Sequence, residues 1–157
     1  MLGAYISAFF ISMLPVVELR LGVPLAMGLG IDQIPAIVVC ALGNIFPIPL
    51  IYIFARRVLQ VGATKKRIGK FCQKMLTKGE TAGETIVNRT GRFGLFMALM
   101  IFVAIPLPGT GAWTGTMAAS FLKIGIRCTF FSVALGVIIA GCIMALGTTG
   151  VFHLLGI

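Results

Sequence analysis

Two charged side chains in an apolar segment are the first candidates for chemistry in this sequence. Glu18 and Arg20 are the only charged residues between Met1 and Ile31. Each would cost about 2.5–3.5 kcal/mol at the centre of a bilayer, so both are expected to face protein, water or each other. Pro15 favours a non-helical turn, and in extended backbone residues two apart share a side. The pair predicts a site that binds an anion through Arg20 and a proton or sodium ion through Glu18. The alternative is an ordinary outside loop between two short helices, where the charges cost little.

A second set of candidates lies in the segment VAIPLPGTGAWTGTM, residues 103–117, within a charge-free run from 93 to 122. Its two prolines remove amide donors and its glycines permit unusual backbone, so an unbroken helix is not expected. A half-helix beginning after Gly111 would present free amides and a positive dipole end, which suit an anion. Trp113 has a second interpretation, as an anchor at the membrane interface. The candidate binding residues here are Pro106, Pro108, Gly109, Thr110, Gly111, Trp113 and Thr114.

The remaining polar residues give weaker signals. Asn44 sits in the apolar stretch GNIFPIP, where it lines the site or bonds to a neighbouring helix, the commoner use of such an amide. His153, the only histidine, is interpreted as an interfacial residue, and the four cysteines lack paired spacing. The sequence carries no metalloprotease, nucleophile or phosphate-loop motif. We therefore expect neither enzymatic activity nor a cofactor or metal.

The composition predicts an integral membrane protein. Of the 157 residues, 59% are hydrophobic and 11% are charged, unlike an average soluble domain. Charge-free runs long enough for a spanning helix cover 1–17, 33–55, 93–122 and 129–157. The net charge of +9 does not indicate nucleic-acid binding, because ten of the 13 basic residues lie between Arg56 and Arg92. This clustering predicts a cytoplasmic linker in a multi-pass protein of the plasma (bacterial inner) membrane.

The two halves of the chain repeat the same order of segments. A single crossing by 93–122 would place Lys123 outside, against the positive-inside tendency, whereas a reversal at PLPGTG returns it to the cytoplasm. The segment LGVPLAMGLGI is also too short to cross alone. Pro15 precedes Asp32, and Pro106 precedes Lys123, by the same 17 residues. We predict an all-α inverted repeat of two re-entrant hairpins and two long helices around a midplane site, with both termini outside.

The predicted boundaries are a first repeat 1–55 (hairpin 1–31, helix 33–55), a linker 56–92, and a second repeat 93–157 (hairpin 93–122, helix 129–157). Within the linker, 65–78 predicts an amphipathic helix on the anionic leaflet that ends at Gly79, with a solvated helix packed on the protein as the alternative. Its apolar stripe is Ile68, Phe71, Cys72, Met75 and Leu76, and its basic face is Lys66, Lys70, Lys74 and Lys78. A small-residue stripe at Gly136, Ala140, Gly141 and Ala145 predicts a homodimer contact, with packing within one chain as the alternative.

At ELRLGVP (18–24) and AIPLPGTGAWTG (104–115) the sequence resembles the small multidrug export proteins, a branch similar to the DedA/SNARE-associated (VTT) superfamily. The resemblance covers nearly the whole chain. The DedA likeness implies facing re-entrant hairpins that flip lipid carriers such as undecaprenyl phosphate, coupled to an ion gradient. It places the acid of the first hairpin at Glu18 and the following proline at Pro24. The second hairpin of DedA proteins carries an arginine on each side of its proline, whereas this chain has apolar or glycine residues at those places. A phosphate-binding role is therefore carried over only if Arg20, from the other hairpin, takes it.

The sequence thus predicts a transporter or flippase for an anionic lipid or small amphiphile, with membrane lipids as its surroundings. One alternative is export of lipophilic cations, in which Glu18 binds the cation and a proton in turn. Arg20 would repel cations, and one Trp and two Tyr do not suffice for the aromatic cage that cations prefer. The other alternative is a non-transporting scaffold that recruits lipids or partners through its basic helix.

Overall fold

The protein is all-helical over the residues described by the computed structural model, which are 2–65, 69–107 and 109–155. Seven helices follow one another along the chain: α1 (Leu2–Ser12), α2 (Glu18–Gly28), α3 (Gln33–Ile45), α4 (Ile48–Ala63), α5 (Gly69–Ala104), α6 (Ala112–Phe121) and α7 (Ile126–Leu155). Three stretches are long and apolar enough to cross a membrane, namely Gln33–Ala63, Gly69–Ala104 and Ile126–Val151. The prediction of an all-α membrane protein is therefore confirmed.

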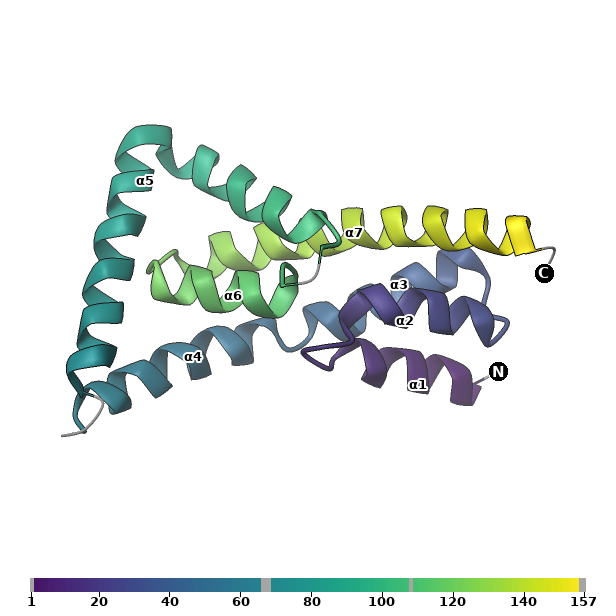
Figure 1. The fold of residues 1–157 in the computed structure, drawn as a ribbon, viewed down its shortest axis with the longest axis horizontal. Coiled ribbons are helices and arrows are strands. Elements are labelled where there is room, and N and C mark those ends of the chain that lie inside the picture. The colour runs from purple at the N-terminus through teal and green to yellow at the C-terminus, as the bar shows by residue number, and fades with distance from the viewer. Residues whose placement is uncertain (1, 66–68, 108, 156–157) are drawn as a thin grey trace.

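The first two helices form an antiparallel pair joined by residues 13–17 (Figure 1). Helix α2 ends in a Schellman-type turn, because the amides of Gly30 and Ile31 bond to the carbonyls of Met27 and Ala26. Gly30 has the positive φ of 82° that such a turn requires. The chain then reverses into α3, which packs against α1 and α2.

The predicted helix 33–55 begins at Gln33 as expected, but its continuity and its end are corrected. It is interrupted after Ile45 and resumes as α4 at Ile48. The physical reason is that Pro47 and Pro49 have no N–H to donate to the carbonyls one turn earlier. The helix also runs on to Ala63, because Arg and Lys are good helix formers and do not end a helix where they leave the apolar segment.

The prediction that the amphipathic helix over 65–78 ends at Gly79 is wrong, because α5 is much longer. The helix passes through Gly79 and bends only at Gly91, whose φ of 68° and ψ of 176° are not helical. Gly79 and Gly83 serve another purpose, since a Cβ at either position would overlap the carbonyl of Phe121 or Leu122. Two residues of the predicted faces, Lys66 and Ile68, lie outside the described residues.

After the bend, α5 runs antiparallel to α6, and the pair leads into α7 (Figure 1). Helix α7 begins at Ile126, three residues before the predicted start, and packs against α2, α3, α5 and α6. The first part of α5 lies across the end of the bundle formed by α4, α6 and α7 (Figure 1). The part of α5 after Gly91 is too short to span a bilayer by itself, although the whole helix has the length of a span.

Each helix pair reaches across to the other half of the chain. Helix α2 packs against α7, and α6 packs against α4. Glycine permits the closest approaches within each half: a Cβ at Gly43 would overlap the Phe9 carbonyl, and one at Gly136 would lie 2.7 Å from the Met100 carbonyl oxygen. Gly141 packs within the chain against Leu19 in the same way. Of the two interpretations of the small-residue stripe on α7, packing within one chain is therefore confirmed.

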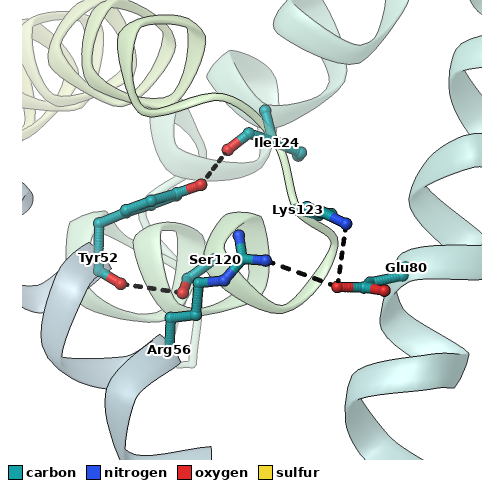
Figure 2. A network of polar contacts seen from close by, with 6 residues as sticks. All are labelled: Tyr52, Arg56, Glu80, Ser120, Lys123 and Ile124. Atoms are coloured by element: carbon teal, nitrogen blue, oxygen red, sulfur yellow. Dashed lines mark hydrogen bonds and ion pairs between the residues drawn. The ribbon is translucent and has the colours of Figure 1, made fainter. Parts of the chain in front are cut away.

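A polar network fixes the first part of α5 to the corner between α6 and α7 (Figure 2). The Glu80 carboxylate lies 3.5 Å from Arg56 of α4 and 3.4 Å from Lys123. Close by, the Tyr52 hydroxyl donates to the Ile124 carbonyl, and the Ser120 hydroxyl donates to the Tyr52 carbonyl at 2.9 Å. The corner after α6 therefore lies at the same end of the molecule as the basic segment.

Candidate functional site

The turns of the two helix pairs meet and enclose a cavity of about 450 Å³. Residues 15–17 and the start of α2 form one side, and Pro106, Gly109 and Thr110 with the start of α6 form the other. The predicted site residues that line it are Glu18, Arg20, Pro106, Gly109, Thr110 and Thr114. Residues that lie about 90 positions apart in the chain are thus brought together.

Glu18 is the buried acid of this site and is 5% exposed. Its Oε1 accepts a hydrogen bond of 3.1 Å from the backbone amide of Trp113, in the first turn of α6. Gly111 precedes that turn and has no side chain to cap it, so a carboxylate from the other helix pair supplies the cap. Negative charge is also favourable at the positive end of the helix dipole. The amides that the sequence analysis offered to a substrate anion are thus occupied by Glu18.

Arg20 reaches the same turn by different contacts. Its Nη2 donates to the backbone carbonyl of Thr110 and to the Thr110 hydroxyl, the latter at 2.6 Å. The Thr110 hydroxyl in turn donates to a carbonyl within its own turn, that of Ile105 or Leu107. Arg20 and Glu18 form no ion pair within 4.0 Å in the described part of the chain. Glu18 and Arg20 therefore bind the second turn separately, at Trp113 and Thr110, which lie three residues apart.

Trp113 joins the two turns through its side chain as well as its amide. The indole Nε1–H donates to the Met13 carbonyl at 3.0 Å. This carbonyl lies just past the end of α1, where the helix leaves carbonyls without intrahelical partners. The side chain itself lines an apolar groove between α4 and α6, together with Met117 and Phe121. Trp113 thus lines the apolar groove, while its amide and its indole bond to Glu18 and Met13 of the first helix pair.

Comparison with protein families identifies the chain. The family model described as "putative small multi-drug export protein" matches residues 18–143, most of the 157 residues. The chain belongs to this family. The family's description indicates a membrane transporter, and the match begins at Glu18 and includes both turns of the candidate site. No curated protein and no solved structure matches the chain.

The other predicted residues of this export-family protein have different surroundings. Gly109 and Gly111 have positive φ angles of 90° and 130°, and a Cβ at Gly111 would overlap the Glu18 carboxylate. Pro24 lies inside α2, away from the residues that line the cavity. Asn44 is 2% exposed in α3, and its Oδ1 has no hydrogen-bond partner. Pro108 lies outside the described residues.

Sequence reasoning missed the backbone half of the site. The carbonyl of Met13 and the apolar residues Val16, Val17 and Leu21 contribute to the joined turns without any recognisable motif. Their only signal was their position beside Glu18. Glu80 was also passed over as part of the linker, although an acid among ten basic residues, with only Glu84 as a second, could have indicated a charge contact.

Proposed function

We propose that this family member transports an anionic amphiphile, which binds between the two turns with its headgroup on Arg20. The observation that carries the proposal is the difference in access between the two charges. Both side chains line the cavity, but Glu18 is 5% exposed and bonded to the start of α6, whereas Arg20 is only half-buried. A guanidinium keeps further N–H donors after Nη2 has bonded to Thr110. An anionic group entering the cavity therefore meets a positive charge with donors to spare.

The apolar groove beside Trp113 supports an amphiphile rather than a small polar anion. It measures about 500 Å³, and all its lining side chains are apolar. On α6 the groove follows Trp113, Met117 and Phe121, which lie on one helix face at intervals of four residues. This stripe is about 12 Å long at 1.5 Å per residue. A headgroup at Arg20 would thus have an adjoining surface for its tail.

The lengths of the helices support the proposal that both pairs are re-entrant. Helices α1 and α2 each have 11 residues and α6 has ten, about half of what a spanning helix needs. The contact of Lys123 with Glu80 places the end of α6 beside the basic segment, as expected if the second pair enters and leaves the membrane on one side. Backbone turns at membrane depth are tolerated when they are buried in protein or line a wet cavity.

An inverted repeat is supported by backbone features that recur 93 residues apart. The described residues with positive φ include Glu18 and Gly111, and also Gly30 and Lys123. The turn after α2 has its counterpart after α6, where Ile124 bonds to Ala119 as Ile31 bonds to Ala26. The starts of α3 at Gln33 and α7 at Ile126 have the same separation, as do the close-packed glycines at 43 and 136. Glu18 and Gly111 differ in side chain, as do Gly30 and Lys123, so at these positions it is the backbone conformation that recurs.

Coupling is assigned in this proposal to Glu18. A proton or sodium ion on the carboxylate would weaken its hold on the Trp113 amide and on the α6 dipole. The contact between the two pairs would then loosen, giving the two arrangements that alternating access requires. The proposal keeps residues 56–92 on the cytoplasmic side and both termini outside. A lipid carrier such as undecaprenyl phosphate remains a prediction from the DedA resemblance, as does a homodimer.

Export of lipophilic cations is the second candidate, because the family description names multidrug export. In that case the substrate would need access to Glu18 and would compete with its bond to Trp113. The two candidates make opposite demands on Arg20, since removing a positive charge weakens the binding of an anion and strengthens that of a cation.

Transport by reconstituted protein separates these functions. Proteoliposomes are loaded on one side with either a fluorescent alkyl phosphate or a lipophilic cation, with and without a proton or sodium gradient. We expect Arg20→Gln to abolish movement of the phosphate and Glu18→Gln to abolish its response to the gradient. Lys70→Gln serves as a charge-matched control away from the cavity. Cation movement that increases in Arg20→Gln would establish the second candidate instead, and no movement of either probe would favour the scaffold.

The proposed orientation has its own test. Single cysteines at Asp32 and Gly125, in a cysteine-free background, mark the corners after the first and second pairs. A membrane-impermeant reagent should label position 125 only from the side of the basic segment and position 32 only from the opposite side. Labelling of both from one side would exclude the inverted arrangement. A reporter at the C-terminus should lie on the side of position 32.

A further inference from the structure

A second groove, at the far end of α6 from the candidate site, combines lysines with apolar side chains. It lies between the first part of α5 and α6 and has a volume of about 600 Å³. Phe71, Met75, Phe121 and Leu122 supply much of its apolar lining. Among the described residues, the charged ones that line it are Lys74 and Lys78, one helical turn apart on α5.

The acidic side chains in this part of α5 do not line the groove. Glu80 binds Arg56 and Lys123, and it lines a different hollow together with Glu84 (Figure 2 shows the Glu80 contacts). The two lysines of the groove therefore have no carboxylate among the lining residues to neutralise them. An occupant that complements this lining must carry negative charge next to an extended apolar part.

We propose that this groove binds one anionic phospholipid, with its phosphate between Lys74 and Lys78 and an acyl chain along Phe71 and Phe121. The place in the fold suits a lipid, because the groove lies between the apolar helix α6 and the basic first part of α5. Its volume lies within the range of small-molecule pockets. An acidic protein segment would match the lysines but would leave the aromatic and Met side chains without an apolar partner.

The bound lipid would brace the second helix pair. Its acyl chain would contact α5 and α6 together, beside the point where Gly79 approaches the Phe121 carbonyl. The ion pair from Glu80 to Lys123 holds the same corner from the other side. This inference does not depend on the proposed transport, because none of its residues lines the cavity at Glu18 and Arg20, and Phe121 alone is shared with the apolar groove beside Trp113.

The test is native mass spectrometry of the full chain in mild detergent, titrated with phosphatidylglycerol or phosphatidylcholine of identical chains. Near an anionic headgroup each lysine contributes about fivefold in affinity. We therefore expect K74Q/K78Q to weaken phosphatidylglycerol binding by about 25-fold. The control K65Q/K70Q removes the same charge from the same segment outside the groove and should cost less than about fivefold.

Further variants distinguish binding of the lipid in the groove from a general attraction to the positive charge of the segment. Ala118→Leu fills the groove without changing charge and should weaken phosphatidylglycerol binding, while Arg20→Gln should leave it unchanged. Inorganic phosphate at millimolar concentration should compete poorly, because it lacks the chain. The inference is overturned if both phospholipids bind equally, if the two double variants lose equal affinity, or if Ala118→Leu has no effect. Equal competition by phosphate would assign the lysines to a free anion instead.

Discussion

The capping of α6 by Glu18 predicts a difference between two substitutions that remove the same charge. Glu18→Gln keeps an oxygen that can accept from the Trp113 amide, whereas Glu18→Ala leaves that amide without a partner. Both variants lose the carboxylate and both escape the cost of burying it. Comparing them isolates the hydrogen bond that one half of the chain gives to the other.

The expected size of the difference comes from the position of the amide. An N-cap residue replaced by Ala costs about 0.5–2 kcal/mol, and a buried donor left unpaired costs about 1–3 kcal/mol. We therefore expect Glu18→Ala to be less stable than Glu18→Gln by about 1–2 kcal/mol. For a chain of this length that corresponds to a fall of roughly 2–8 °C in the thermal midpoint.

The assay is thermal unfolding in detergent followed by tryptophan fluorescence. Trp113 is the only tryptophan, and its indole bonds across the joined turns to Met13, so its emission reports on the contact itself. Glu18→Gly is a further comparison. Glu18 has a φ of 48°, a conformation that costs a non-glycine residue about 1–2 kcal/mol, so Glu18→Gly should be more stable than Glu18→Ala.

Equal midpoints for Glu18→Gln and Glu18→Ala would refute this account, because the oxygen at Oε1 would then contribute nothing to the joined turns. A Glu18→Gly variant no more stable than Glu18→Ala would show that the backbone at position 18 is not held at positive φ. Circular dichroism of each variant excludes a general loss of helix as the cause.

Three further substitutions test the packing and the backbone. Gly111→Ala should lower the thermal midpoint and shift the Trp113 emission, because its Cβ would overlap the Glu18 carboxylate at a φ of 130°; an unchanged midpoint would contradict the close approach. Lys123→Gly should raise the midpoint, because it relieves a backbone strain of about 1–2 kcal/mol at a φ of 58°. Loss of the exposed ion pair offsets up to about 1 kcal/mol of this gain, and a clear fall in the midpoint would contradict the prediction. Gly136→Ala should cost about 1–3 kcal/mol in unfolding experiments, while Gly125→Ala, which meets no atom within 4 Å, should cost little; similar losses for both would refute the packing.

The sequence was most informative where the lipid bilayer constrains it. Length, hydropathy and the cluster of basic residues were enough to predict an all-α membrane protein, and the prolines and glycines of 103–117 correctly predicted a break between α5 and α6. The isolated charges Glu18 and Arg20 were expected to face protein, water or each other, and both bond to the turn before α6 or to its first residues. A charge in an apolar segment has few acceptable surroundings, so its type and position carry much information.

The linker was predicted less well because, unlike a membrane-spanning segment, its helix is not constrained by the bilayer. Gly79 is a typical helix end by sequence, but α5 continues because the corner after α6 packs against it. Tertiary contact of this kind overrides a propensity of about 1 kcal/mol, and nothing local in the sequence records it. The partner of Glu18 was hidden for the same reason, since a backbone amide has no residue type.

Each half of the chain supplies a different part of the site, and one pair of backbone positions shows this. Glu18 and Gly111 both have positive φ and lie 93 residues apart, at the start of α2 and just before α6. A carboxylate at both positions could not be accommodated, because a Cβ at Gly111 would already overlap the Glu18 side chain. One half therefore supplies the acid and accepts a strain of about 1–2 kcal/mol, and the other supplies the space and the amide that bind it. An exact symmetry of sequence would destroy this contact, so the positive φ shared by these two positions does not require the same residue at both.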